Sequence, residues 1–499
     1  MKDTIIEILD YPKPTPLILV EGFLSTTGSV GWSPLKRYLS GYEKSLGDRD
    51  VMIASVGPIS SLHDRACELY YAIKGGTVDY GEDHSRIHGH KRYGRIHDPG
   101  LYPTWSSTRP LHFLGHSIGG ATIMKLQYLL SMNFFSPDDH PDMMLSVTGV
   151  SSPFRGTQIV YTLGERTDGA PSVRPFSIGN AISKVVHILS YFSPVLPSAL
   201  DFHADSRALS YRESSFSELL CHLWKSNWAE SRDATPFDVT FEAADLRDVE
   251  GEGRCNTRTY YRSYTSCMTT RSSSSPYDPR HWPSNSSVLF PPLYLSAHSI
   301  GTFDFSALIP QPSFVSLPSP LEFSTPTKNT KEEELCTSSS PSPPSPNSAN
   351  RLPPIKACDD DEVDIDTCAH ASKHVPVLRE EHFANDGIVP VFSQWHPLDC
   401  AQTQCIHHNH IYNDNINSGD KEDNDDSSNY NDITHSSDSS PKDPTIQPGI
   451  WNVYTLEDHH HLSLLPFWIG SPSQLKFWDD LGTYLDDIDS QEQKSQSYV

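Results

Sequence analysis

The feature that most constrains the fold is the segment at residues 110–120, Pro-Leu-His-Phe-Leu-Gly-His-Ser-Ile-Gly-Gly. A short apolar run leads into a Gly-x-Ser-x-Gly turn, and apolar side chains then recur at helical spacing at Ala121, Met124 and Leu129. This order predicts a strand, a sharp turn and a helix. A serine in such a turn sits on strained backbone with its hydroxyl clear of the sheet. Gly-x-Ser-x-Gly also occurs by chance in ordinary turns, but the flanking strand and helix favour a nucleophile at Ser117.

Other apolar runs alternate with helical patterns along the chain. Residues 16–20 are a continuous apolar run, as expected of a strand buried on both faces, and residues 50–56 and 145–150 are expected to be further strands. Residues 60–73 place apolar side chains at helical spacing, and the Gly75-Gly76 pair is expected to end that helix. Strands and helices that alternate at this pace predict an α/β fold with a mostly parallel central sheet.

Two low-complexity tracts cannot build a core. Residues 310–378 are rich in Pro and Ser and then acidic, whereas residues 409–446 are rich in Asn, Asp and Ser. Both are expected to be disordered insertions in one enlarged domain that covers residues 1–499. The acidic run at 359–362 could also suggest a calcium site, but a solvated, disordered run is the favoured interpretation.

Charge and composition exclude some classes of function. The formal net charge is −25, which disfavours a nucleic-acid partner. The nine cysteines have irregular spacing, so no disulfide framework is expected. No run approaches the length of a transmembrane helix, and the first residues lack the apolar stretch of a signal peptide. The cytoplasm is therefore the default expectation.

Residues 172–204 differ in character from the segments around them. Ile182, Val185, Ile188 and Phe192 belong to a strongly apolar helical pattern bounded by prolines. A core helix would explain the pattern. A helical lid over an apolar cleft would explain it too, because a lid also needs one apolar face. We predict the lid.

A serine nucleophile needs a base and an acid that orients the base. Asp386 lies in an Asn-Asp-Gly turn, on a compact island between the two tracts, although turn chemistry alone would also favour Asp there. Residues 459–461 are all histidines, which could instead form a surface patch or a metal cluster. The order Ser, Asp, His is that of the α/β-hydrolase fold. Chemistry alone does not choose among the three histidines.

The same fold predicts where an oxyanion would be held. One donor is the backbone N–H of the residue after the serine, which is Ile118. The second donor comes from the loop after the first strand, where Phe23 is the natural candidate.

Three segments carry a specific resemblance to a known family. They are residues 56–68 (Val-Gly-Pro-Ile-Ser-Ser-Leu-His-Asp-Arg-Ala-Cys-Glu), 75–81 (Gly-Gly-Thr-Val-Asp-Tyr-Gly) and 88–95 (His-Gly-His-Lys-Arg-Tyr-Gly-Arg). In them the chain resembles the thermophilic bacillary triacylglycerol lipases of family I.5 and the related staphylococcal lipases. The two low-complexity tracts have no counterpart in that family. The resemblance implies an α/β-hydrolase fold with Ser117, Asp386 and His461 as its catalytic triad. Spacing in the family, measured from the Gly-x-Trp-Asn block at 449–452, favours His461 over the other two histidines.

The resemblance also implies a structural zinc ion. Carried over by motif, the zinc ligands are Asp64, His84, His90 and Asp238, a closed four-coordinate set. Such an ion would staple the segment before the nucleophile strand to the segment after the lid. Without the resemblance, solvated His and Asp side chains would be the simpler interpretation. The calcium site of the family is not expected here, because its glutamate is replaced by Ser463.

Taken together, the resemblance implies a lipase that hydrolyses acylglycerol esters through an acyl-enzyme intermediate. Such an enzyme would meet the lipid–water interface through its lid. A carboxylesterase or acyltransferase acting on shorter or soluble acyl esters is the alternative within the same chemistry. A non-catalytic lipid-binding scaffold is the alternative of another class. The family is largely secreted, which leaves secretion open beside the cytoplasm.

Overall fold

The computed structural model describes residues 13–24, 28–40, 48–197, 202–203, 206–271, 278–284, 291–316, 378–408, 446–465 and 471–497. The chain divides into two compact units, residues 1–312 with 378–499, and residues 313–377. In the second unit the structure describes one short helix, α11 (Ser313–Ser316). Apart from their end residues, the two predicted insertions lie outside the described residues. All that follows concerns the first unit.

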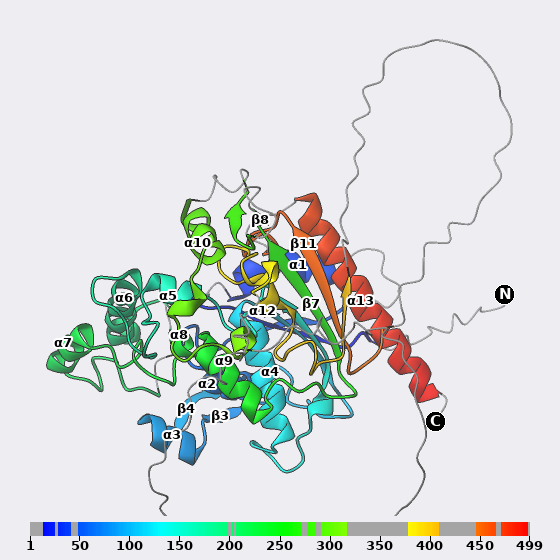
Figure 1. Cartoon of the computed structure of the whole chain (residues 1–499). Coiled ribbons are helices and arrows are strands. Elements are labelled where there is room, and N and C mark those ends of the chain that lie inside the picture. Colours follow the sequence, from blue (N-terminus) through cyan, green and yellow to red (C-terminus); the bar gives the residue numbers. More distant parts are fainter. Residues whose placement is uncertain are drawn as a thin grey trace, which may run out of the picture. The chain divides into compact units, whose positions relative to one another are not determined.

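A seven-stranded sheet forms the centre of this unit (Figure 1). Every pairing of neighbouring strands in it is parallel, which confirms the predicted α/β sheet. From edge to edge the strands are β10 (Cys405–His408), β11 (Trp451–Glu457), β7 (Tyr260–Cys267), β6 (Met144–Val150), β5 (Leu111–His116), β1 (Leu17–Val20) and β2 (Val51–Ala54).

Helices cover both faces of the sheet, and the alternation of side chains along β1 shows why. Leu17 and Leu19 pack into one apolar cluster with residues of α1 (Gly28–Ser40) and α13 (Pro472–Ser497). Ile18 and Val20 pack into the opposite cluster with α2 (Leu62–Lys74) and α4 (Ile118–Ser131). Because both of its faces are buried, β1 is a continuous apolar run rather than an alternating one.

The ends of α2 agree with the sequence signals. The Ser61 side chain caps the helix by accepting the N–H of Asp64 at 3.2 Å. Gly75 follows the last turn with φ +90, a conformation that favours glycine. The helix thus begins and ends at fixed points, which holds Asp64 near its N-terminus.

The segment at residues 77–99 contains regular elements. They form most of an antiparallel pair, β3 (Gly76–Asp79) with β4 (Tyr93–His97), and α3 (Glu82–His88) lies between the two strands. A register shift between Thr77 and Asp79 breaks the alternation that would have revealed the pair in the sequence. The sequence did not predict β10 and β11 either.

The remaining elements lie outside the central sheet and the helices named above. They are α5 (Ile159–Leu163), α6 (Ile178–Phe192), α7 (Phe216–Trp224), α8 (Thr235–Asp238), α9 (Phe241–Glu250), α10 (Pro291–Gly301), α12 (Val391–Trp395), and the antiparallel pair β8 (Thr269–Arg271) and β9 (His281–Pro283). Among the described residues, no helix combines the length and apolar character needed to cross a membrane.

Candidate active site

Ser117 lies in a sharp turn between β5 and α4. Its φ is 55° and its ψ is −134°, a strained conformation for a residue with a side chain. The turn is crowded, because a Cβ atom on Gly119 would lie 2.2 Å from the carbonyl oxygen of Val20. Only glycine fits there. The predicted strand, turn and helix are therefore present, with Ser117 at the strained position.

Asp386 and His461, which are far apart in the sequence, form a hydrogen-bonded pair. His461 Nδ1 lies 2.8 Å from Asp386 Oδ2, and both residues are buried. The other carboxylate oxygen of Asp386 accepts the backbone N–H groups of Ile388 and Val389, at 2.9 and 2.8 Å. With both oxygens engaged, the carboxylate is fixed in orientation and holds the proton of the imidazole on Nδ1.

His461 also lies beside the Ser117 turn. The ring of His116, the residue before the serine, is 4.9 Å from that of His461, and its Nε2 lies 3.0 Å from the His461 carbonyl oxygen. Burial lowers the pKa of His116 to about 3, so this ring is neutral and donates its N–H to that carbonyl. The two histidines before His461 have other partners. His459 Nδ1 contacts the Glu457 carbonyl, and His460 Nδ1 accepts the N–H of Leu462.

An apolar cleft of about 770 Å³, partly open to solvent, reaches Ser117. Gly22 brings the loop after β1 against the serine, since a Cβ there would lie 2.8 Å from Ser117 Cβ. Both predicted oxyanion donors, Phe23 and Ile118, belong to the cleft wall. Other residues of the wall are Pro153, Thr157, Ile159, Val160, Leu163, Glu165, Val173, Gly179, Ile182, Trp228, Ala229, Thr235, Pro236, Val239, Ile388 and Val389.

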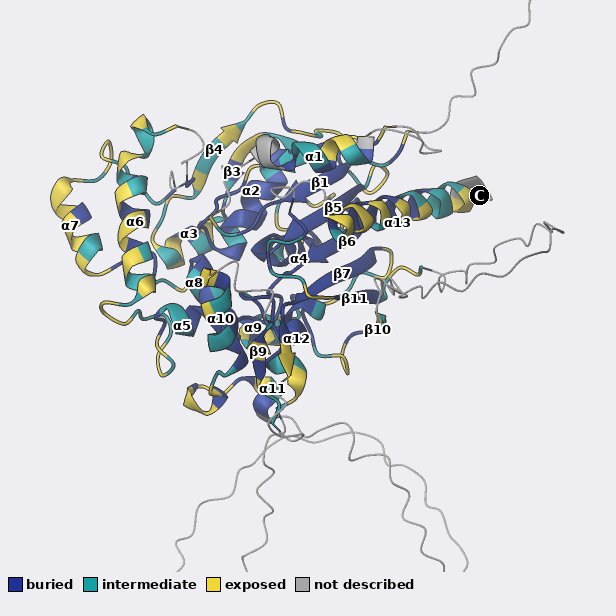
Figure 2. Ribbon diagram, turned by 90° about the horizontal axis from the view of Figure 1, so that it is seen from above, coloured by how far each residue is buried: buried dark blue, intermediate teal, exposed yellow. Residues whose placement is uncertain are grey.

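Helix α6 lies within the predicted lid region, and helix α7 follows that region along the chain. α6 buries Ser183, Val186, His187 and Ser190, whereas its apolar residues Ile178, Val185, Ile188 and Phe192 are exposed. α7 likewise exposes Phe216, Leu220 and Trp224. Figure 2 shows these two helices at one end of the unit with much exposed surface. Within residues 172–204, positions 198–201 and 204 lie outside the described residues.

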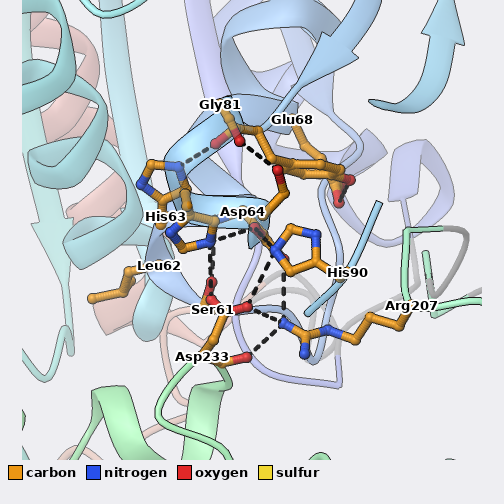
Figure 3. A network of polar contacts seen from close by, with 12 residues as sticks. Ser61, Leu62, His63, Asp64, Glu68, Gly81, His90, Arg207 and Asp233 are labelled. Carbon is orange, nitrogen blue, oxygen red and sulfur yellow. Dashed lines mark hydrogen bonds and ion pairs between the residues drawn. The ribbon is translucent and has the colours of Figure 1, made fainter. Parts of the chain in front are cut away.

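A second group of ionisable side chains lies between α2, α3 and the segment before α8. The ligand atoms of Asp64, His84, His90 and Asp233 lie within 4.8 Å of one another. His84 Nε2 is 3.3 Å from Asp64 Oδ1 and 3.3 Å from Asp233 Oδ1, and His90 Nε2 is 3.4 Å from Asp233 Oδ2. Figure 3 shows His90, Asp64 and Asp233 turned toward one point.

The donor set fits a divalent metal ion. Three of its buried atoms, Asp64 Oδ1, His84 Nε2 and His90 Nε2, have no hydrogen-bond partner, and leaving such atoms unpaired costs free energy. Nitrogen and oxygen ligands at ordinary zinc distances would lie about 3.4 Å apart around a tetrahedral ion. The observed separations are of that size.

The side chains around the group favour a positive charge and hold the ligands in place. Burial opposes protonation of His84, yet the carboxylates of Asp233 and Asp64, each 3.3 Å from its Nε2, raise its pKa to about 9, so they favour a positive charge between them. Arg207 Nη2 lies 2.5 Å from Asp233 Oδ2 and 3.3 Å from Asp64 Oδ2, so it fixes both carboxylates from outside. His63 stacks on His84 with 3.7 Å between the ring centroids.

Comparison with known proteins places this geometry in a family. The family described as "Lipase-like, C-terminal domain" matches residues 13–281, more than half of the chain. The chain belongs to this family. The curated relatives include the lipase of Staphylococcus hyicus, which is 29% identical over 279 residues, and lipase 1 of Staphylococcus aureus, which is 27% identical over 278 residues. These matches confirm the resemblance to the staphylococcal lipases.

The match to those relatives is partial on both sides. It covers 51% of this chain, and 40% and 38% of the S. hyicus and S. aureus lipases, so the chain matches less than half of their length. Solved structures extend the likeness in fold to nearly the whole chain. The S. hyicus lipase aligns over 97% of this chain and 98% of its own, with a TM-score of 0.60 and 20% identity.

Two further solved structures share the fold. EstA from Clostridium botulinum aligns over 98% of this chain and 92% of its own, with a TM-score of 0.52 and 20% identity. Lipase 1 from Pelosinus fermentans aligns over 95% of this chain and 99% of its own, with a TM-score of 0.51 and 22% identity. These likenesses concern the fold alone.

The structure corrects one of the four predicted metal ligands. Asp233, not Asp238, lies with Asp64, His84 and His90. Asp238 is the last residue of α8, and its Oδ2 instead accepts the N–H of Leu62, at the start of α2, at 2.6 Å. Asp233 lies just before this short helix and Asp238 ends it, five positions apart, so the sequence offered no periodic signal to tell them apart. Arg207 was missed for a similar reason, since it comes from a distant, irregular segment.

Proposed function

We propose that the chain is a serine ester hydrolase of the lipase type. Ser117 attacks the ester carbonyl while His461 takes the hydroxyl proton and then passes it to the leaving alcohol. Asp386 keeps the imidazole in the tautomer that leaves Nε2 free to accept that proton, and stabilises the imidazolium. The N–H groups of Phe23 and Ile118 hold the oxyanion. Water, activated by His461, then releases the acyl group from Ser117.

The observation that carries this proposal is the apolar cleft that reaches Ser117. A cleft lined almost wholly by apolar side chains favours an acyl chain, whose burial contributes about 0.8 kcal/mol per CH₂ group. The buried His461–Asp386 pair, 2.8 Å apart beside the nucleophile turn, supports an activated serine rather than a simple binding pocket.

Acylglycerols are the proposed substrate class, taken from a lipid–water interface. The exposed apolar faces of α6 and α7 support this choice, because such side chains gain from contact with lipid. A carboxylesterase or acyltransferase with shorter or soluble substrates would use the same triad. A lipid-binding scaffold would use the cleft without the chemistry.

Labelling with a fluorophosphonate probe and hydrolysis of p-nitrophenyl acyl esters test the nucleophile. Ser117→Ala should abolish labelling and lower the hydrolysis rate by at least about a thousandfold. Ser131→Ala, at the other end of α4, is the matched control and should leave both unchanged. Full activity in Ser117→Ala would refute the proposal, and an unlabelled wild-type chain would favour the scaffold.

The acyl-chain profile separates the two kinds of esterase. A lipase should prefer long-chain esters and gain rate when an emulsion forms, because the interface and the cleft both reward apolar area. Highest activity on dissolved short-chain esters, with no gain at an interface, would assign the chain to the carboxylesterase alternative instead.

We also propose that Asp64, His84, His90 and Asp233 hold a zinc ion. Two neutral imidazoles and two carboxylates make a closed, charge-balanced set for Zn²⁺, which favours a structural ion over a catalytic one. It would fasten α2 and α3 to the segment before α8. Since Asp64 lies on the helix that packs against α4, such an ion would stiffen the support of the nucleophile turn.

A further inference from the structure

A second group of potential metal ligands lies at the opposite part of the sheet, away from the first. His396, Cys400, Cys405 and His407 place one ligand atom each within 4.8 Å of one another. His396 follows α12 directly, and Cys400 lies in the loop after it. Cys405 and His407 are two residues apart on the edge strand β10, so they point to the same side of the sheet.

The separations within this group are those of a tetrahedral metal site. His396 Nε2 lies 3.5 Å from Cys400 Sγ, and His407 Nε2 lies 3.5 Å from Cys400 Sγ and 3.5 Å from Cys405 Sγ. With zinc–nitrogen bonds of about 2.0 Å and zinc–sulfur bonds of about 2.3 Å, nitrogen and sulfur ligands lie about 3.6 Å apart. Three separations that involve all four residues match this value.

The two histidines are held in the orientation that ligation needs. His396 is fully buried, and its Nδ1 donates to the Leu398 carbonyl at 2.8 Å. This hydrogen bond puts the proton on Nδ1 and leaves the lone pair of Nε2 toward the sulfur of Cys400. The ring of His407 packs edge-on against Trp395, with 4.6 Å between the centroids.

The position of the group gives the ion a mechanical role. β10 has four residues and pairs with one neighbour, β11, at the edge of the sheet. Its Ile406 is 42% exposed and its His407 is exposed, so apolar burial contributes little to hold it. Ligands on both β10 and the loop after α12 would supply that missing stabilisation.

We propose that His396, Cys400, Cys405 and His407 form a second, structural zinc site that fastens the edge strand to α12. Two thiolates and two imidazoles are the ligand set of closed zinc sites, and the two thiolate charges neutralise Zn²⁺. The Asp386 turn benefits, because Gln394 of α12 donates to the Val389 carbonyl at 3.0 Å. The site requires no assumption about the chemistry at Ser117.

Cobalt replacement in the full-length wild-type chain tests the site without any variant. Co²⁺ bound by thiolates gives an intense sulfur-to-cobalt charge-transfer band in the near ultraviolet, whereas the Asp/His group has no sulfur and gives none. We expect that band, and two zinc ions per chain by elemental analysis of the native protein. A thiol-blocking reagent should release one of the two ions, since Cys400 is exposed.

Cysteine variants test whether the ion binds at this group. Cys400→Ser with Cys405→Ser should lose one zinc ion per chain and the cobalt band, and Cys221→Ser, at an exposed cysteine on α7, is the control that should keep both. A cobalt-loaded wild-type chain without the charge-transfer band would overturn the proposal. A Cys400–Cys405 disulfide in the native protein, seen as a mass lower by two hydrogens with no zinc bound, would overturn it too.

Discussion

At the scale of single residues, Asp233 and Asp238, near the two ends of α8, have pKa values shifted in opposite directions by their surroundings. Burial opposes ionisation of Asp233, yet the adjacent imidazole of His84 and the charge of Arg207 hold its pKa well below the ordinary value. At Asp238, burial outweighs the charge of Arg247 and the hydrogen bond from Leu62, and it raises the pKa to about 7. One carboxylate is therefore kept ionised, as a metal ligand must be, and the other tends toward the neutral acid.

Exchanging each aspartate for asparagine separates their roles. Asp233→Asn should lose one metal ion per chain, or bind it at least about tenfold more weakly, because the ligand charge is gone. Asp238→Asn should keep the full metal content, since the amide oxygen can still accept the N–H of Leu62. Elemental analysis after gel filtration is the measurement. The reverse pattern would restore Asp238 as the ligand and remove Asp233.

The sequence predicts individual residues well where a local motif fixes them. Ser117 is set by its own turn, and His461 could be chosen by family spacing before the structure placed it beside Asp386. Asp233 and the His396 group could not be found in this way. Their ligands come from segments with no common period, and only the folded chain brings them together.

At the scale of elements, α6 is amphipathic in an unusual sense. The side it buries carries Val186 together with Ser183, His187 and Ser190, whereas Val185 and Ile188 are 53% and 41% exposed. A helix in water normally buries its apolar stripe. The exposed apolar side chains support a surface that meets lipid. The Ser177 cap holds the start of the helix by accepting the N–H of Asn180 at 3.1 Å.

Polar substitutions on this face should affect emulsified substrates selectively. Val185→Ser with Ile188→Ser removes about 1–2 kcal/mol of apolar contact with lipid, so the rate on emulsified long-chain triacylglycerol should fall roughly tenfold. The rate on a dissolved short-chain ester should hardly change. Val249→Ser, at an 88% exposed position on α9, is the matched control. Equal losses on both substrates would instead indicate that α6 supports the fold or the cleft.

The sequence predicts elements well where apolar periodicity is strong, as for β1, β5, α2 and α4, all of which are present. It fails for the pair β3 and β4, where a register shift interrupts the alternation. β10 was missed because its Cys-Ile-His-His sequence is short and polar. An edge strand of this kind is defined by its neighbour β11 more than by its own residues.

At the scale of the whole molecule, the last helix ties together parts of the chain that are far apart in sequence. Asp489 on α13 accepts the backbone N–H of Thr15 at 3.1 Å and pairs with Arg49 at 2.9 Å. His112 Nε2 on β5 lies 3.2 Å from the same carboxylate. The N-terminal strands and the C-terminal helix are thus joined at one buried charge.

Stability against acid should depend on this carboxylate. Burial opposes the shift, but the hydrogen bond and charge of His112 and the charge of Arg49 lower the pKa of Asp489 to about 2. Because the folded-state pKa lies below the ordinary value of about 3.9, its stabilisation is complete above about pH 5 and is lost as the pH falls toward 2. Asp489→Asn should therefore lower the free energy of unfolding by roughly 2 kcal/mol at pH 7.

Urea unfolding of wild type and Asp489→Asn at pH 7, 5 and 3.5 measures this difference. The gap in unfolding free energy should be equal at pH 7 and pH 5 and should narrow at pH 3.5, because the wild-type unfolded state then binds a proton that the folded state excludes. Asp138→Asn, at an exposed position after α4, should show no gap at any pH. A gap that persists unchanged at pH 3.5 would mean that the amide disturbs packing, and that the charge of Asp489 does not hold α13 to the sheet.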